Sequence, residues 1–161
     1  MTILAFDQAT RTSGWSVFKD DKLIDYGTFT FTDNNLGLRL WKIRQKVEEL
    51  YRKYLPDKII YEDIQLQQGA VNNVVTFKSL AEVFGIIYEY ATELGVENEA
   101  ILSGVWRKGL GIAGTKRDER KANTQKWVFD NCGVRATEDE ADAIAIGAYA
   151  AGIRMEKQKV R

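Results

Sequence analysis

The segment between residues 36 and 63 constrains the fold of this chain most strongly. Within residues 36–54, apolar side chains recur at spacings of three and four, which predicts an amphipathic helix. The only proline, Pro56, lies just beyond this helix and prevents its continuation, and residues 57–63 then have the pattern of a buried strand. A helix that leads directly into a buried strand implies a crossover connection, which returns the chain parallel to a strand already in the sheet.

The rest of the chain predicts an α/β domain with a mixed sheet. Three closely spaced strand-like runs open the chain and should form an antiparallel meander. The predicted elements outside residues 36–63 are strands at about 2–8, 13–19, 22–31 and 99–102 and helices at about 74–94, 116–130 and 138–152. Residues 65–73 are expected to be a loop or a frayed helix start, and Ser103 is a candidate N-cap for a brief helix. We predict a single domain, 1–161, in which helices flank a five-stranded mixed sheet.

The composition suits an ordinary globular domain of this size. The chain has 161 residues, of which 45% are hydrophobic and 29% charged. A single cysteine, Cys132, excludes an intramolecular disulfide and is compatible with a reducing compartment. The first residues lack the pattern of a signal peptide, and no apolar stretch approaches the length of a membrane span. We therefore expect a cytoplasmic protein that does not associate with membranes.

Charge is balanced overall but divided between two segments. The chain has 23 basic and 23 acidic residues, whereas an excess of Lys and Arg is typical of nucleic-acid binders. Residues 107–126 nevertheless hold seven basic side chains against two acids, and residues 130–142 hold five acids against Arg135. Two solvated surfaces of opposite sign would explain this division, and so would a phosphodiester-cutting enzyme with an acidic metal site beside a basic strip.

Acidic residues stand where a folded α/β chain could bring them together. Asp7 ends the first strand-like run, Glu62 and Asp63 end the buried strand, and Asp139 and Asp142 open the last helix. Successive strand residues face opposite sides of a sheet, so only one of Glu62 and Asp63 can join Asp7. The chain contains no histidine, and a cluster of carboxylates suits Mg²⁺ or Mn²⁺ better than zinc or copper. These acids predict a metal-dependent nuclease, because carboxylate-held divalent ions commonly serve phosphodiester cleavage.

The acids of the last helix divide into two kinds. Thr137 and Glu140 fit a capping box, and acids in a first turn also complement the helix dipole. Asp142 lies deeper, among small apolar residues, where an unpaired carboxylate is costly to bury. Because residues three apart share a helix face, Asp139 and Asp142 can point toward one site.

Several segments, in this order along the chain, resemble RuvC-type Holliday junction resolvases. They are Ile3-Leu4-Ala5-Phe6-Asp7, Gly14 before the second strand, Ile60-Tyr61-Glu62 and Asp139-Glu140-Ala141-Asp142-Ala143-Ile144-Ala145-Ile146. The last segment is the most specific, and the looser motifs suggest the bacteriophage branch of the family. The resemblance implies a ribonuclease H-like fold, a homodimer and a soluble enzyme of the host bacterial cytoplasm.

The resemblance also implies an activity and a catalytic set. It implies a crossover junction endodeoxyribonuclease that nicks four-way DNA in pairs, leaving 5′-phosphate and 3′-hydroxyl ends, as used in DNA recombination and repair. Asp7, Glu62, Asp139 and Asp142 are the implied metal ligands for two Mg²⁺ ions per active site, with Mn²⁺ as a substitute, and this choice favours Glu62 over Asp63. Lys121 is the best match to the family's active-site lysine.

Some positions depart from the family pattern. Gln8-Ala9 follow the first aspartate, where the family usually has Pro-Gly, and Gln65 stands where bacterial members carry an aromatic wedge. The DNA contacts implied by position are Gln65, Lys116, Arg117 and, at the scissile phosphate, either Arg107 or Lys108. Trp106 is one of several aromatic residues that could stack on bases, although packing in the core is the more frequent role of such a residue.

Two other functions are compatible with the same residues. One is a broader nuclease of the same superfamily that acts on forks, flaps and three-way junctions or processes RNA, and it would need no symmetric dimer. The other is a DNA-binding module without catalytic activity, which the presence of all four acids argues against.

Overall fold

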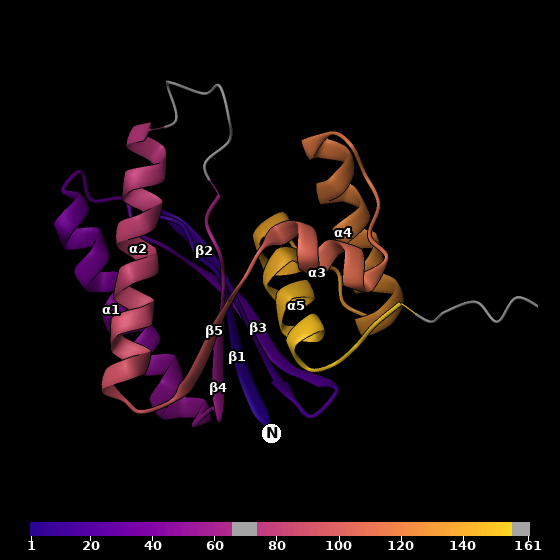
Figure 1. Cartoon of the computed structure of the whole chain (residues 1–161), viewed down its shortest axis with the longest axis horizontal. Coiled ribbons are helices and arrows are strands. Elements are labelled where there is room, and N and C mark those ends of the chain that lie inside the picture. Colours follow the sequence, from indigo (N-terminus) through magenta and orange to yellow (C-terminus); the bar gives the residue numbers. More distant parts are fainter. Residues whose placement is uncertain (66–73, 156–161) are drawn as a thin grey trace, which may run out of the picture.

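The computed structural model describes residues 1–65 and 74–155, and in it five strands form one sheet with helices on both sides (Figure 1). The strands are β1 (Thr2–Asp7), β2 (Thr12–Lys19), β3 (Lys22–Thr30), β4 (Lys58–Glu62) and β5 (Glu97–Ile101). Their order is β3-β2-β1-β4-β5, with β1, β2 and β3 antiparallel and with β4 and β5 parallel to β1. The predicted meander, crossover and mixed five-stranded sheet are confirmed.

The helices form two layers. They are α1 (Leu36–Tyr54), α2 (Val74–Glu93), α3 (Ser103–Leu110), α4 (Arg117–Cys132) and α5 (Glu138–Ala150). Figure 1 shows α1 and α2 on one face of the sheet and the other three on the opposite face, where α3 and α4 pack against α5. The predicted cap at Ser103 is wrong, because Leu102 is the N-cap and makes no side-chain cap bond, while Ser103 is already helical. Most of the predicted loop at 65–73 lies outside the described residues.

Strand alternation builds a separate hydrophobic core on each face of the sheet. On β1, Leu4 and Phe6 belong to the core under α1 and α2, whereas Ile3 and Ala5 belong to the core under α5. The amphipathic stripe of α1 buries Ile43, Val47 and Leu50 in the first core, and Arg39 of the same helix is also buried. The side to which a strand residue points is therefore fixed by its parity, and this decides which strand-end side chains can meet α5.

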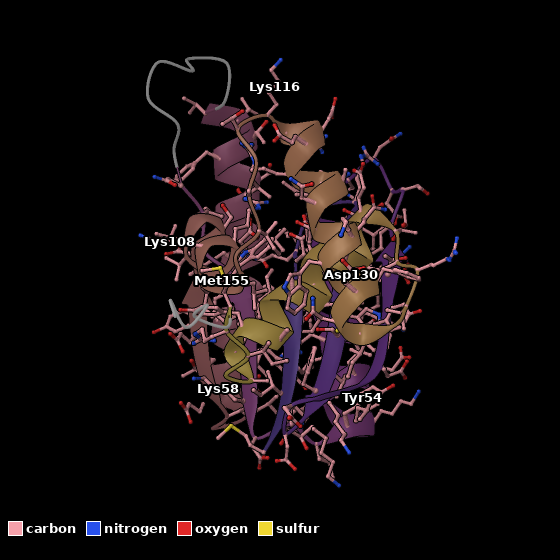
Figure 2. The ribbon with its side chains drawn as sticks, turned by 90° about the vertical axis from the view of Figure 1, so that its right-hand side faces the viewer. Tyr54, Lys58, Lys108, Lys116, Asp130 and Met155 are labelled. Atoms are coloured by element: carbon pink, nitrogen blue, oxygen red, sulfur yellow. The ribbon has the colours of Figure 1, made fainter. Side chains whose placement is uncertain are left out.

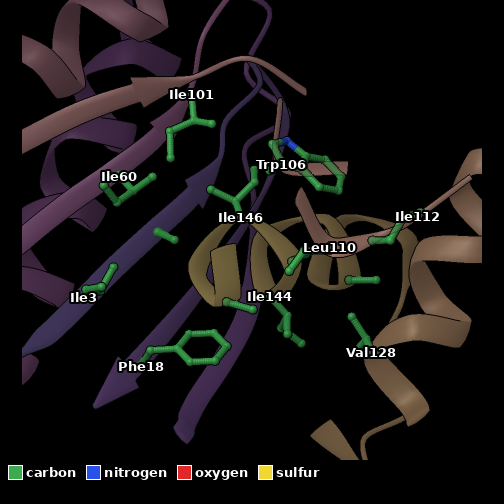
Figure 3. Packing of buried hydrophobic residues seen from close by; sticks show 14 residues of the cluster. Ile3, Phe18, Ile60, Ile101, Trp106, Leu110, Ile112, Val128, Ile144 and Ile146 are labelled. Atoms are coloured by element: carbon green, nitrogen blue, oxygen red, sulfur yellow. The ribbon is translucent and has the colours of Figure 1, made fainter. Parts of the chain in front are cut away.

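Helix α5 lies close to the sheet because it is made of small residues. Every residue from Ala141 to Ala148 is buried. A Cβ on Gly147 would come within 2.6 Å of Ser16 Oγ, so the absence of a side chain there permits the approach. Ser16 Oγ also donates a hydrogen bond of 2.7 Å to the carbonyl of Ala143. Figure 3 shows side chains of this core, in which Ile144 and Ile146 of α5 belong to one cluster with strand residues such as Ile3 and Ile60.

In the two described segments, no helix combines the length and the apolar character needed to cross a bilayer.

Candidate active site

Two carboxylates leave the ends of adjacent parallel strands toward α5. Asp7 continues the Ile3–Ala5 side of β1, and Glu62 continues the Ile60 side of β4. The last backbone pair between the two strands is Phe6 with Tyr61, so Asp7 and Glu62 follow it side by side. Asp63 has the opposite parity, and its side chain accepts a hydrogen bond from the amide of Ile64 instead. The alternation thus places Glu62, and not Asp63, beside Asp7.

The N-terminal part of α5 brings the second pair of acids, Asp139 and Asp142, to the same place. Thr137 and Glu140 form the predicted capping box, with both of its hydrogen bonds present. Asp142 is 2% exposed, whereas Asp139 is only partly buried. Gly14, the backbone partner of Asp7 on β2, faces this turn, and a Cβ there would lie 2.1 Å from the carbonyl oxygen of Asp139. A glycine is required at position 14 for α5 to come this near to the end of β1.

Burial and the repulsion between neighbouring negative charges shift the pKa values of three of these carboxylates. The pKa of Asp7 is raised well above its usual 3.8, first by burial and then by the negative charges of Glu62, Asp142 and Asp139. Burial also raises the pKa of Glu62 and that of Asp139, and the charge of Asp142 adds to both shifts. All four predicted acids are therefore close enough to influence one another.

Lys121 of α4 belongs to the same cluster. Its ammonium group donates a hydrogen bond to Oδ2 of Asp142, and both side chains are almost buried. Burial alone would lower the pKa of Lys121, but the pKa is raised because Asp142, Asp7 and Asp139 stabilise the charged form. The structure thus brings the predicted lysine and the four predicted acids together.

Two residues that hold Glu62 were missed in the sequence. The indole of Trp106 donates a hydrogen bond of 3.2 Å to Glu62 Oε2, and the side-chain amide of Gln8 bonds the main chain of Glu62. Trp106 is completely buried, which confirms the interpretation as core packing and excludes the alternative that it stacks on bases (Figure 3). Gln8 carried a signal that could have found it, because it replaces the proline usual in the resembling family.

The residues predicted to contact DNA differ in how far their side chains are buried. Arg107 of α3 is half-buried, and its guanidinium stacks on the Trp106 ring at 4.5 Å. Its positive charge opposes the rise in the pKa of Glu62 that burial causes. Lys108, in contrast, is exposed. Figure 2 shows Lys116, at the start of α4, at the opposite end of the molecule from Lys58, where β4 begins. The end of the sheet that carries Glu62 therefore lies on the Lys116 side.

A cavity of about 340 Å³ adjoins the cluster on the α2 side. Its lining residues are Gln8, Glu62, Asp63, Ile64, Gln65, Thr76, Phe77, Leu80, Leu102 and Ser103. Gln65 is exposed at this cavity, in the position predicted for a wedge. Arg117 is likewise exposed, next to Lys116.

The donor set suits a hard divalent cation. Within residues 1–65 and 74–155, Asp142 Oδ1 is buried without a hydrogen-bond partner, while Oδ2 is bound by Lys121. An unpartnered buried carboxylate oxygen among repelling acids is costly, and a cation would relieve both costs. In the same described residues, no three Asp, Glu, Cys or His side chains already have the arrangement of ligands around a metal ion. The residues present fit a Mg²⁺ or Mn²⁺ site in chemistry, and small side-chain movements would have to complete it.

Comparison with known proteins gives one relative by sequence. The chain is 26% identical over 152 residues to the crossover junction endodeoxyribonuclease RuvC of Syntrophomonas wolfei subsp. wolfei, covering 91% of this chain and 86% of that protein. No protein-family model matches the chain.

Solved structures with the same architecture include resolvases from distant sources. Thermus thermophilus RuvC in complex with a Holliday junction superposes with a TM-score of 0.74 at 17% identity and covers 94% of both chains. The Fowlpox virus resolvase with its Holliday junction DNA gives a TM-score of 0.60 at 15% identity, covering 94% of this chain and 97% of that one. The expected ribonuclease H-like fold is thus confirmed, while a place in the bacteriophage branch stays a prediction. By sequence and by fold, the chain is thus similar to the RuvC Holliday junction resolvases.

Proposed function

We propose that this protein is a metal-dependent DNA endonuclease that resolves Holliday junctions by paired nicks. The observation that carries the proposal is the meeting of Asp7 and Glu62, from two parallel strand ends, with the buried Asp142 near the start of α5. The sequence relative is a crossover junction endodeoxyribonuclease, and two of the similar structures hold Holliday junction DNA. The expected products carry 5′-phosphate and 3′-hydroxyl ends.

Asp7, Glu62, Asp139 and Asp142 would hold two Mg²⁺ ions, or Mn²⁺ in their place. Asp7 lies between the Glu62 side and the α5 side of the cluster, which makes it the natural bridging ligand. Bound there, the ions would supply an activated water and stabilise the leaving oxygen of an in-line displacement. The unpartnered Oδ1 of Asp142 is the described atom that most directly supports a cation at this place.

The cluster's own residues would perform the remaining tasks. Trp106 fixes the rotamer of Glu62 through Oε2. Lys121, once its bond to Asp142 is exchanged, would orient the attacking water or neutralise the charge that develops on the phosphate. Arg107 lies close enough to Glu62 to influence its charge, which favours it over Lys108 as the group that holds the scissile phosphate.

A four-way junction has approximate two-fold symmetry, so paired cuts require two active sites in a symmetric dimer. We propose that the chain forms this homodimer through α2. Val74, Val75 and Tyr88 of α2 are 58%, 79% and 54% exposed, an unusual display of apolar surface for one helix. The mass in solution, measured by light scattering, would be twice that of one chain.

A broader branched-DNA nuclease is the second candidate. It is favoured by the exposed Gln65, which cannot intercalate at the predicted wedge position as an aromatic side chain does. Such an enzyme would cut forks, flaps or three-way junctions as well as four-way junctions.

The experiment incubates the purified chain with synthetic four-way, three-way, fork and linear DNA, with and without Mg²⁺. Asp7→Asn should lower the rate at least about 1,000-fold, equivalent to about 4 kcal/mol of transition-state stabilisation. Asp63→Asn is the matched control, because it changes the neighbouring acid of opposite parity and should retain activity. Absence of metal-dependent cutting by the wild type would refute a nuclease function, and cutting of forks but not of four-way junctions would favour the second candidate.

A further inference from the structure

We infer that Gln8 is a positioning residue of the active site, because its side-chain amide extends the β1–β4 ladder by one step and fixes the main chain of Glu62. The inference deepens the proposed nuclease function and rests on it. Gln8 is 7% exposed and therefore belongs to the interior of the site. Its parity turns it away from α5, so it does not itself join the four acids.

The backbone pairing between β1 and β4 ends before the acids are reached. The register runs from Ile3–Lys58 to Phe6–Tyr61, and the next step would be Asp7 with Glu62. At that step the carbonyl of the Gln8 side chain accepts a hydrogen bond of 3.1 Å from the amide of Glu62. The side-chain nitrogen of Gln8 donates one of 2.6 Å to the carbonyl of Glu62. One primary amide thus takes the place of a peptide group in the sheet.

The other edge of Glu62 is held by β5. Glu62 pairs with Ile101, and the amide of Asp63 donates a 2.9 Å bond to the Ile101 carbonyl. Trp106 holds the carboxylate itself. Glu62 is therefore fixed on both sides of its main chain and at its side chain, and Gln8 provides the fixation on the side of Asp7.

Loss of the Gln8 amide would release Glu62 at one specific point. The amide and carbonyl of Glu62 would lose these partners at a partly buried position, and the strand end could move away from Asp7. Residues that orient metal ligands typically affect metal affinity or activity 10–100-fold when changed. Binding of the DNA backbone, which depends on the basic side chains, should change little.

The test compares Gln8→Met with the wild type and with Gln125→Met. Methionine matches the length of glutamine but cannot form either hydrogen bond. Gln125 is the control, because its side chain also donates to a main-chain carbonyl, that of Ala136 at 3.0 Å, and not to that of Glu62. Three quantities are measured: the Mg²⁺ concentration for half-maximal cutting, the rise in melting temperature that Mn²⁺ alone produces, and the affinity for a four-way junction without divalent metal.

We expect Gln8→Met to need about 10–100-fold more Mg²⁺ and to lose most of the Mn²⁺-induced rise, with junction affinity within about two-fold of the wild type. Gln125→Met should keep the wild-type response to both metals. If Gln8→Met does not fold, Gln8→Asn serves, because its amide is one methylene too short to span the same two bonds.

Equal metal responses in the Gln8 variant and the wild type would overturn the inference. If no chain cuts branched DNA but the Mn²⁺ response still separates the two, the nuclease proposal fails while the positioning role of Gln8 stands.

Discussion

The two faces of the sheet are both buried, but they are packed in different ways. Under α1 and α2 the core uses bulky side chains, with Tyr61 and Phe84 packed edge to face at 5.0 Å. Under α5 the core also contains bulky side chains, but the closest approaches to the sheet occur at Gly14 and Gly147, where Gly14 meets the Asp139 carbonyl. Close approach is what allows carboxylates on α5 and on the strand ends to share one site, and bulky packing would hold them apart.

Buried charge separates the faces further. On the α1 side, Arg39 is buried, and its guanidinium donates only to main-chain carbonyls, among them those of Thr10 and Asp33. On the α5 side, the pKa values of Asp7 and Glu62 are raised, and Lys121 pairs with the neighbouring carboxylate of Asp142. The first arrangement is a satisfied structural contact. In the second, buried carboxylates repel one another, and a bound cation would reduce this repulsion.

The two faces should differ most in the unfolding free energy that is lost when one lysine is replaced on each face. Lys121→Met leaves Asp142 buried and unpaired, so the metal-free unfolding free energy should fall by about 3–5 kcal/mol. Lys46→Met on α1 breaks only an exposed pair with Glu49 and should cost less than about 0.5 kcal/mol. Chemical denaturation in the presence of a chelator measures both, and similar losses would remove the distinction between the faces.

Replacing a glycine by alanine should destabilise the protein on the α5 side of the sheet and stabilise it on the α2 side. Gly14→Ala forces a Cβ into the Asp139 carbonyl and should cost about 2–3 kcal/mol, with loss of cutting. In the described residues a Cβ on Gly85 of α2 would meet nothing within 4 Å, so Gly85→Ala should gain about 0.5–1 kcal/mol. Thermal and urea unfolding of the two variants give the comparison, which a destabilised Gly85→Ala or a tolerated Gly14→Ala would contradict.

This contrast also shows what the sequence could and could not predict. Periodicity was sufficient for the strands, for α1 and for the crossover to β4, because each depends on local alternation and on Pro56. The meeting of Asp7 with the start of α5 depends on Gly14 and on packing across 125 or more positions, and the motif resemblance supplied it where local pattern could not. Gln8 and Trp106 were missed because a side-chain bond to a distant main chain, or to a distant carboxylate, has no periodic signal.

Replacing Asp7 should change the stability of the metal-free protein less than Lys121→Met or Gly14→Ala does, and it should raise the stability instead of lowering it. Its raised pKa means that the folded protein holds this proton more tightly than the unfolded chain does. The resulting contribution to stability is present below about pH 3.8 and is lost as the pH rises through the raised pKa of the folded state. Asp7→Asn should therefore stabilise the metal-free protein near neutral pH while abolishing activity.

Unfolding curves of the wild type and Asp7→Asn, recorded with a chelator between pH 4 and 8, test this expectation. The difference in stability between the two should widen as the pH rises, and Mg²⁺ should stabilise only the wild type. A variant less stable than the wild type at neutral pH would show that repulsion is not stored in the cluster.

The smallest change in stability should come from Arg107, which contrasts with Arg39 on the opposite face. Among the described residues, Nε of Arg107 is buried without a hydrogen-bond partner, so its guanidinium stacks on Trp106 but is not held by hydrogen bonds as that of Arg39 is. Arg107→Gln should alter the unfolding free energy by less than about 0.5 kcal/mol but slow cutting about ten-fold, because a phosphate ligand is lost.

Lys108→Gln should leave the cutting rate unchanged at saturating DNA and only reduce the salt dependence of binding by about one counterion. Single-turnover rates and salt titrations distinguish the two, and a larger rate loss at Lys108 would reverse the assignment of the phosphate contact.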